Sequence, residues 1–419
     1  MPLGISSGFW LLVGILRSVF EIFDKRKNNN ETHKYKTSNI AVVIPAHNEE
    51  LVIKACIRAL KQSIDKKQIY VASDGSTDKT YIKARSEQVK VVDINPGIGK
   101  AKALVHTIKK FNLFKKYKFI FIVDADTKID KYFATRALGL FEDKEIKVIF
   151  GTARINWPSH IIPRLGLYFV AYRERLNRML QFFFMYGQTW KHTNVPYVIP
   201  GFATIYRSKT LKKLKIDTPG ILIEDFNLAF QFHRKKLGKI GYSPTLVGWD
   251  QHPDNLIDYW KQVRRWNIGF FQTIKKNGIW PSFFWLSLGI FIFEVTLHAI
   301  FLLFLPFLAL YWLSPWLLGN LPLYDSFVNL YGQFGPFQNV SIITILVSIF
   351  LYDYGMTIVF GLMGKKPQFA LYGLFFFFMH YVTSLILISS IIPGFFGKSE
   401  GRWISPKRYS VGLTSGHIA

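Results

Sequence analysis

Cysteine is almost absent from this chain: Cys56 is the single one in 419 residues. One cysteine permits no internal disulfide and no zinc site built from several thiolates, which is consistent with a reducing compartment. Acidic residues are also scarce, since 27 Asp and Glu stand against 53 Lys and Arg, for a formal net charge of +26. Nucleic-acid-binding proteins are one class with such a charge.

Charge of either sign is nearly missing from residues 282–419, which hold only six basic and four acidic residues. Residues 1–281 therefore carry 47 basic and 23 acidic residues, a net charge of +24 against +2 for the rest. A basic part followed by an apolar part is typical of a cytoplasmic domain attached to membrane helices. A soluble nucleic-acid-binding protein has no use for that apolar part, so we expect no nucleic-acid partner.

The apolar part contains three segments long enough to cross a bilayer, at residues 282–313, 338–363 and 369–393. The first is overlong, and Pro306 can split it into a hairpin. We therefore expect three or four transmembrane helices after residue 281. The sequence leaves open on which side of the membrane the basic C-terminal tail lies.

A further apolar segment, residues 5–23, is about long enough to span a bilayer, but Arg17 and Glu21 interrupt it. A spanning helix and an interfacial anchor both remain open. The basic residues 25–27 that follow place the next segment in the cytoplasm if the helix spans.

Between residues 40 and 151, short apolar segments alternate with helical ones. The strand-like segments are rich in Val and Ile and read IAVVIP, IYVASD, VKVVDI, FIFIVDAD and KVIFGT. Strand–helix alternation predicts an α/β fold with a mainly parallel sheet. In such open sheets, ligands bind at the carboxyl ends of the strands.

Acidic residues stand at several of these strand ends. Asp124 and Asp126 flank one small residue in VDAD, a pair that can hold Mg²⁺ or Mn²⁺ through oxygen ligands. Asp74 ends the strand before DGSTD, and Glu49 follows the strand IAVVIP. A simple turn also favours Asp at a strand end, so each motif alone fits either a turn or a site.

Lys100 follows NPGIG, which superficially resembles a phosphate-binding loop. A Walker motif needs Gly at position 94 and Ser or Thr at 101, where this chain has Ile94 and Ala101. We therefore expect no P-loop hydrolase, although Lys100 at a helix start can face a diphosphate.

Glu224 and Asp225 precede residues with helical spacing, so we expect both in the first turn of a helix. Either they are acids favoured by the helix dipole, or Asp225 is a general base. Farther on, YWKQVRRWNIGFFQTI (259–274) fits an amphipathic helix at the membrane surface. In a functional interpretation its cations meet a departing phosphate, and Trp266 stacks on a ring.

Taken in order, these motifs resemble the family 2 membrane glycosyltransferases with the inverting GT-A fold. The segments DGSTD, VDAD, IED and QVRRW match the four signature regions of that family. Within it, the chain is most similar to the poly-N-acetylglucosamine, hyaluronan, chitin-oligosaccharide and cellulose synthases. The tail RWISPKR resembles the first of these. One departure is Ile223, where those synthases usually have Thr before the Glu–Asp pair.

The resemblance implies a Rossmann-like mixed sheet in a cytoplasmic GT-A domain, joined to an α-helical transmembrane region. The expected division is an N-terminal membrane helix and linker (1–38), the GT-A domain (39–257), an interfacial helix with the Gln-x-x-Arg-Trp motif (258–281), and the transmembrane helices with the basic tail (282–419).

The resemblance also implies a role for each site residue. It assigns nucleotide binding to Glu49, Asp74, Lys100, Asp124 and Arg265, metal binding to Asp126, catalysis to Asp225 with Glu224, and acceptor binding to Gln262, Trp266 and Gly201. Gly201 lies in the strand-like segment VIPGFATIYRS (198–208), for which a buried edge strand is the alternative. The implied metal is Mg²⁺ or Mn²⁺.

The implied activity is hexosyl or N-acetylhexosaminyl transfer from a UDP-sugar, with UDP-N-acetylglucosamine as the expected donor. The implied location is the plasma membrane, with several crossings and the catalytic domain in the cytoplasm. The acceptor is either a growing β-linked polysaccharide that is also exported, or a membrane lipid that receives a single sugar. The motifs do not separate these two, and they leave room for an accessory export or activating subunit.

Overall fold

The computed structural model describes residues 34–157, 164–183, 193–319, 321–334 and 342–397, together with residues 12, 13, 15, 16 and 19. The predicted N-terminal membrane segment therefore lies mostly outside the described residues, and the basic tail with RWISPKR lies wholly outside them.

The α/β part of the described chain is built on one eight-stranded mixed sheet with the order β3-β2-β1-β4-β7-β6-β8-β5. The strands are β1 (Ile40–Ala46), β2 (Ile69–Asp74), β3 (Lys90–Ile94), β4 (Phe119–Val123), β5 (Lys128–Ile129), β6 (Ile146–Ile155), β7 (Ala203–Arg207) and β8 (Lys239–Asp250). The four strands from β3 to β4 pair in parallel, and β7 runs antiparallel to both of its neighbours. The five predicted strands are present, but β7 lies inside the sheet and is not an edge strand.

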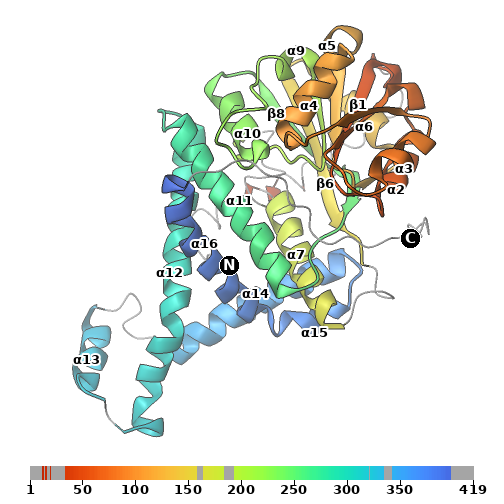
Figure 1. The fold of residues 1–419 in the computed structure, drawn as a ribbon. Coiled ribbons are helices and arrows are strands. Elements are labelled where there is room, and N and C mark those ends of the chain that lie inside the picture. Colours follow the sequence, from red (N-terminus) through yellow and green to blue (C-terminus); the bar gives the residue numbers. More distant parts are fainter. Residues whose placement is uncertain are drawn as a thin grey trace.

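Strands β1, β2 and β4 are buried along their whole length. Their nearly continuous apolar sequences fit this position, because helices cover both faces of a parallel sheet. The helices of this part are α2 (Ile53–Lys61), α3 (Thr80–Ser86), α4 (Lys100–Lys110), α5 (Leu113–Lys116), α6 (Phe133–Leu140), α9 (Ser208–Leu211) and α10 (Glu224–Arg234). In Figure 1 they gather with the sheet at one end of the molecule.

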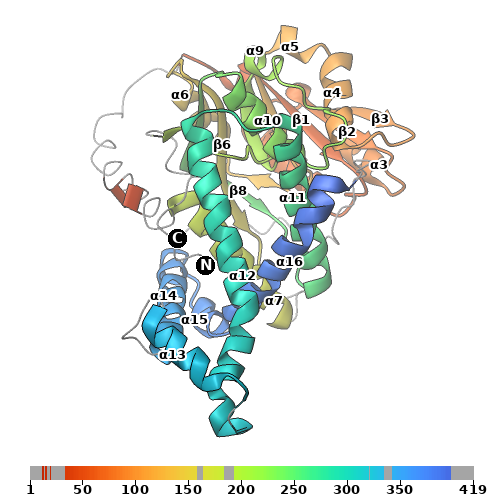
Figure 2. The ribbon, with the colours of Figure 1, turned by 90° about the vertical axis from the view of Figure 1, so that its left-hand side faces the viewer.

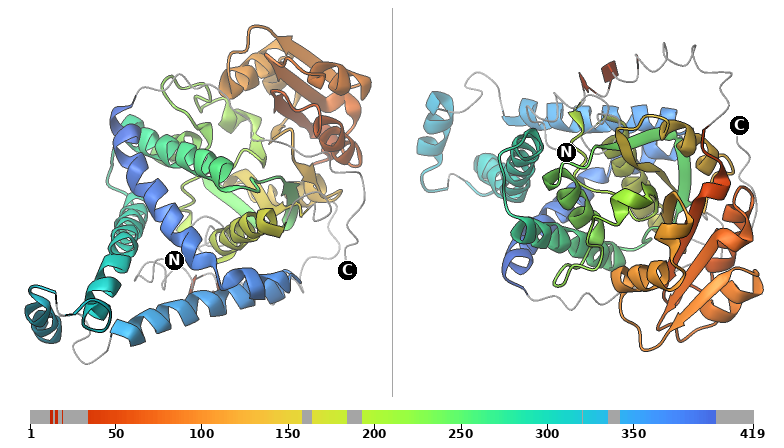
Figure 3. Two further views of the ribbon diagram at one scale, coloured as in Figure 1. Left: turned by 60° about the horizontal axis from the view of Figure 1, so that its bottom comes forward. Right: turned by 90° about the horizontal axis from the view of Figure 1, so that it is seen from above.

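Two long helices, α7 (Arg164–Phe183) and α11 (Leu256–Asn277), lie between the sheet and the apolar helices. The apolar region comprises α12 (Phe283–Leu317), α13 (Tyr324–Phe334), α14 (Ile342–Met363), α15 (Gln368–Gly373) and α16 (Phe376–Phe396). Figure 2 shows α12 running from beside α11 to the far end of the molecule, and Figure 3 shows α16 crossing α11. A Cβ atom at Gly394 of α16 would lie 2.5 Å from the Cβ of Phe271, so the small residue allows this close crossing.

Within the part of the chain that the structure describes, three helices are long and apolar enough to cross a membrane: Phe283–Leu317, Leu346–Met363 and Phe376–Phe396. The hairpin considered for the first segment does not form, because α12 continues through Pro306. A proline costs a helix one hydrogen bond, which the rest of a long apolar helix tolerates. The third predicted segment is divided, since α15 ends before α16 begins.

A chain of buried polar contacts fixes α7 to α14 and α16. Arg175 on α7 is 0% exposed; its Nε donates to Thr357 Oγ1 at 2.8 Å, and its Nη2 donates to the Asp353 carboxylate. The other oxygen of Asp353 lies 3.0 Å from His380 Nε2, and Tyr172 Oη lies 2.9 Å from His380 Nδ1. These contacts join the helix under the sheet to the apolar helices.

Candidate active site

A cavity of about 410 Å³ opens between the carboxyl ends of the central strands, α10 and α11. Its volume lies in the range of about 300–1,000 Å³ typical of small-molecule sites. Ten of the eleven predicted site residues line it: Glu49, Lys100, Asp124, Asp126, Gly201, Glu224, Asp225, Gln262, Arg265 and Trp266. Residues separated by more than two hundred positions thus meet in one place.

Asp74 is the predicted site residue that does not line this cavity. It ends β2 and is 2% exposed, and its carboxylate accepts hydrogen bonds from the amides of Ile98 at 2.7 Å and Gly99 at 2.8 Å. Asp74 therefore anchors the loop that delivers Lys100, the first residue of α4. Its contact with a uridine remains a prediction.

Asp124 and Asp126 directly follow β4, at the centre of the sheet. Among the described residues, no group of three or more His, Cys, Asp and Glu side chains could hold a metal ion by itself. Mg²⁺ and Mn²⁺ do not need such a group, because they are commonly held by one or two carboxylates, with phosphate oxygens and water completing the shell. Two carboxylates on one cavity wall fit a cation of that kind, shared with a diphosphate.

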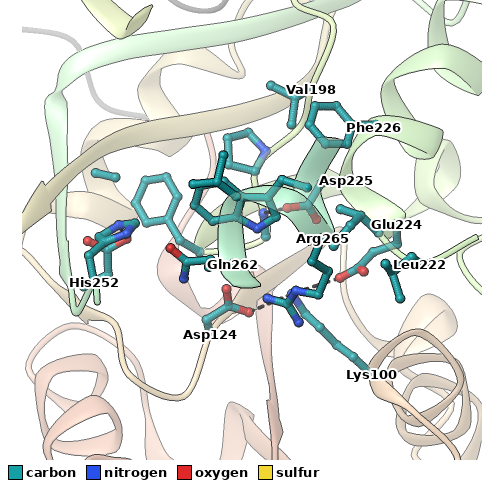
Figure 4. A pocket seen from close by; sticks show the side chains of 18 of the residues that line it. Lys100, Asp124, Val198, Leu222, Glu224, Asp225, Phe226, His252, Gln262 and Arg265 are labelled. Carbon is teal, nitrogen blue, oxygen red and sulfur yellow. Dashed lines mark hydrogen bonds and ion pairs between the residues drawn. The ribbon is translucent and has the colours of Figure 1, made fainter. Parts of the chain in front are cut away.

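Lys100 reaches between the two acidic walls of the cavity (Figure 4). Its Nζ lies 2.9 Å from Asp124 Oδ1 and 2.9 Å from Glu224 Oε1. Burial disfavours the charged ammonium, but the carboxylates outweigh that effect, and the pKa of Lys100 lies well above its usual value. Lys100 is thus a permanent positive charge among acids.

Asp225 lies in the first turn of α10, where Oδ2 accepts a hydrogen bond from the Gly201 amide at 2.9 Å. Burial, reinforced by the neighbouring charge of Glu224, raises the pKa of Asp225 to about 7. A Cβ atom at Gly201 would lie 2.8 Å from Lys100 Nζ and 3.0 Å from Asp225 Oδ1, so a larger residue would crowd both. A carboxyl with this pKa can accept a proton near neutral pH.

Ile223 precedes α10 and packs on α11. The synthases that this chain resembles usually have Thr at this position. A Cβ atom at Gly269 of α11 would lie 2.5 Å from Ile223 Cγ1, so the isoleucine fills the space that this glycine leaves. Next to it, the Leu222 amide donates to Gln272 Oε1 at 3.0 Å. These two contacts hold the start of the helix that carries Asp225 against α11.

Trp266 on α11 is flanked by two residues that sequence reasoning missed. The guanidinium of Arg173, from α7, lies 4.4 Å from the centre of the indole ring. The ring of His252 meets Trp266 edge-on, with centroids 6.2 Å apart. Arg173 gave no sequence signal, because α7 contains several arginines and its pattern does not say which of them faces the cavity.

Several hydrogen-bond acceptors along the cavity wall have no partner among the residues that the structure describes. Four of these buried atoms are Oδ1 of Asp250, Nδ1 of His252, Oε1 of Gln181 and Oε1 of Gln262. Buried polar atoms are normally satisfied, so a ligand that offers several donors would suit this wall. Asp250 ends β8, and the strand-end rule that found Asp124 could have found it too.

Comparison with known proteins agrees with this geometry. Residues 41–212 match the model of the family described as Glycosyl transferase family 2. The chain carries a family 2 glycosyltransferase domain. It is 24% identical over 319 residues to a poly-beta-1,6-N-acetyl-D-glucosamine synthase of Staphylococcus epidermidis, covering 72% of this chain and 74% of that protein. It is 28% identical over 306 residues to the probable glycosyltransferase YdaM of Bacillus subtilis, covering 66% and 67%.

Among solved structures, the glycosyltransferase resembles the mannosyltransferase PcManGT of Pyrobaculum calidifontis, solved with GDP-Man and Mn²⁺. The two share 13% identity at a TM-score of 0.53, over 93% of this chain and 100% of the other. This likeness concerns the fold alone. The mixed sheet confirms the predicted GT-A class, and the three candidate spans agree with a membrane protein.

Proposed function

We propose that this glycosyltransferase transfers a sugar from a UDP-sugar to the end of a β-linked polysaccharide, with inversion at the anomeric carbon, and exports the product. UDP-N-acetylglucosamine is the proposed donor, because a similar protein is a poly-beta-1,6-N-acetyl-D-glucosamine synthase. The observation that carries the proposal is the position of Asp225, a half-buried carboxyl that lines the same cavity as Asp124 and Asp126 and whose pKa is raised to about 7.

In this proposal the donor lies along the strand ends, with Glu49 and Asp124 beside its nucleoside. Asp74 keeps the loop before α4 in place. Its contact with the uridine is the part of this proposal that rests on the family resemblance alone. Lys100 and Arg265 face the diphosphate, and their positive charges stabilise the negative charge that develops on the departing UDP.

Asp225 takes the proton from the acceptor hydroxyl as its oxygen attacks the anomeric carbon. The new C–O bond forms on the face opposite the diphosphate, whose oxygen leaves with the bonding pair. An α-linked donor therefore gives a β-linked product. Proximity supplies a large part of the rate, because Gly201 fixes one oxygen of Asp225 and leaves the other for the acceptor. Glu224 holds Lys100 beside the reacting groups.

The metal part of the proposal rests on Asp126, with Asp124 next to it. These carboxylates would hold Mg²⁺ or Mn²⁺, which when bound supplies positive charge to the diphosphate. Trp266 and Gln262 would contact the acceptor sugar, close to Asp250 Oδ1 and His252 Nδ1, which have no partner among the described residues.

The proposed location is the plasma membrane, crossed several times, with the catalytic domain in the cytoplasm. The three candidate spans and the strongly basic catalytic part support this orientation. The division of the chain at about residues 38, 257 and 281 is likewise a proposal. An accessory export subunit is compatible with it.

The test is a donor screen with purified protein in lipid vesicles containing Mg²⁺ or Mn²⁺. We expect UDP release with one donor, UDP-N-acetylglucosamine, and a ladder of lengthening glycans. No UDP release with any donor would remove the proposal. Release with a different UDP-sugar would correct the donor but keep the chemistry.

A further inference from the structure

A second cavity, of about 150 Å³, adjoins the catalytic cavity. It is lined by Tyr197, Phe226, Asn267, Phe270, Phe271, Phe291, Ile292, Val295, Thr296 and Leu387. Tyr197, Phe226 and Asn267 line both cavities, so the two share a wall. We name the second one the apolar cavity.

The apolar cavity lies between α10 and α11 on one side and α12 and α16, two helices that qualify as membrane spans, on the other. Its residues on α12, Phe291 to Thr296, begin eight residues after the helix start at Phe283. At 1.5 Å per residue they lie about 12–20 Å along the helix axis. Leu387 stands similarly deep in α16, nine residues before its end at Phe396.

The chemistry of the two cavities differs sharply. The catalytic cavity is lined by acids, Lys100 and arginines, whereas no described residue that lines the apolar cavity is charged. Its polar groups are limited to Asn267, Thr296 and the Tyr197 hydroxyl. A glycan in such a place would lose many hydrogen bonds to water without replacement, whereas a hydrocarbon chain would lose none.

Two aromatic rings form the boundary between the cavities. The rings of Tyr197 and Phe226 are stacked, with centroids 6.2 Å apart and an interplanar angle of 7°. Phe226 directly follows Asp225 in α10. A molecule whose hydroxyl lies at Asp225 therefore has the apolar cavity on the far side of these two rings.

We propose that the acceptor on which synthesis starts is a membrane lipid with a hydroxyl-bearing head group, whose hydrocarbon chain occupies the apolar cavity. This inference rests on the proposed glycosyl transfer and names its first acceptor. The lipid hydroxyl gives its proton to Asp225, its oxygen forms the bond to the anomeric carbon, and UDP leaves with the electrons of the broken bond. Later sugars are added to the lipid-linked product.

The experiment fills the apolar cavity with a larger side chain and measures how much radiolabelled sugar is transferred to lipid. Val295→Trp places a large ring in the apolar cavity. Leu297→Trp is the control, because Leu297 lies two residues farther along α12, is 55% exposed and lines neither cavity. Both variants and the unmodified protein are reconstituted in lipid vesicles with radiolabelled donor, with and without a short soluble β-linked N-acetylglucosamine oligomer. Organic extraction separates labelled lipid from labelled soluble glycan.

We expect the unmodified protein and Leu297→Trp to produce organic-soluble label at equal rates. Val295→Trp should produce at least about tenfold less, while extending the soluble oligomer normally. Equal organic-soluble label from both variants would overturn the inference, as would a product that is wholly water-soluble in the unmodified protein. Loss of oligomer extension in Val295→Trp would mean that the cavity carries the glycan and not a lipid.

Failure of the proposed function gives a different result, namely no UDP release from the unmodified protein with either acceptor. Val295→Phe, a smaller filling, provides a second measurement if Val295→Trp does not fold. An intermediate loss of organic-soluble label is expected for it, and no loss would contradict the inference.

Discussion

The ion pairs of the catalytic cavity and the ion pair between α7 and α14 have different surroundings. In the catalytic cavity, Lys100 lies between Asp124 and Glu224, and the side chains of Lys100 and Asp124 are 20% and 32% exposed. Between the apolar helices and α7, Arg175 pairs with Asp353 at 0% exposure of the arginine and lines neither cavity. Among the described residues, the first region has more acids than cations, whereas Arg175 and Asp353 are one cation and one acid.

The difference indicates that the first region serves ligand binding and catalysis and that the second stabilises the fold. An excess of one charge beside an open cavity is unfavourable unless a ligand completes it, which is typical of active sites. A matched pair between helices is already complete, and removing one partner leaves the other buried and uncompensated. Substitutions in the first region should therefore affect turnover, and substitutions in the second should affect folding.

The largest effect is expected at the catalytic cavity, with Asp225→Asn. An amide has nearly the same shape but accepts no proton, and loss of a general base costs about 10²–10⁴-fold in rate. Sugar transfer should fall by that factor, while UDP binding and the thermal unfolding midpoint stay near their original values. Asp93→Asn, at an exposed carboxylate of β3, is the matched control. Transfer at more than a tenth of the original rate would remove the base assignment.

The reverse pattern is expected for Arg175→Met at the helix interface. Breaking a buried pair costs about 3–5 kcal/mol, because the carboxylate of Asp353 loses its cation. The thermal unfolding midpoint in detergent should drop clearly, while the protein that remains folded should turn over the donor normally. Arg164→Met, at an exposed position of the same helix, should change neither. Reduced turnover at unchanged stability would end the distinction between the regions.

Asp126→Ala addresses the metal within the catalytic cavity. Loss of an outer-shell partner already lowers metal affinity by about 10–100-fold, so loss of a ligand should weaken Mn²⁺-dependent UDP binding at least tenfold. Calorimetric titration with and without a chelator measures this. In chelator the variant and the original protein should bind UDP equally. Equal binding in Mn²⁺ would show that the cation is held elsewhere.

The two regions also differ in how far the sequence predicted them. Strand ends and helix starts are visible in a sequence, so Asp124, Asp126 and Asp225 could be found before the structure. Arg175 and its partner could not, because hydrophobic periodicity does not tell which helix a polar residue will face. The same reason hid Arg173 beside Trp266.

Other features were unpredictable because they depend on tertiary contacts. Asp74 stood at a strand end like the others, yet its oxygens are taken by the amides that follow Ile94. The apolar cavity is assembled from α10, α11, α12 and α16, and none of these segments carries a signal for it alone. The fold was easier to predict, since alternating apolar strands and helices leave few arrangements.

A moderate effect is expected from pH. Asp225 must be deprotonated to accept a proton, and its pKa lies near 7. Below that pH, kcat/KM should fall about tenfold per pH unit, and above it should level off. Lys100→Met removes a positive charge that lowers the pKa of Asp225, so the rising limb should move to higher pH. A limb near pH 4 in the unmodified protein would assign the titration to an ordinary exposed carboxyl.

The smallest effect is expected from Ile223→Thr, which restores the residue of the resembling synthases. The change removes apolar contact with Gly269, a loss of about 1 kcal/mol for each buried methylene. It also places a hydroxyl at the position before α10, where no side chain now caps the helix and where a Thr cap contributes about 1 kcal/mol. The two terms oppose each other, so stability should change by less than about 1 kcal/mol and turnover by less than about threefold. Comparison of initial rates and unfolding midpoints tests this, with Ile221→Thr as the control in the same loop. A large gain in turnover would mean that the hydroxyl acts on the acceptor. Residue 223 would then determine substrate specificity and would not serve packing alone.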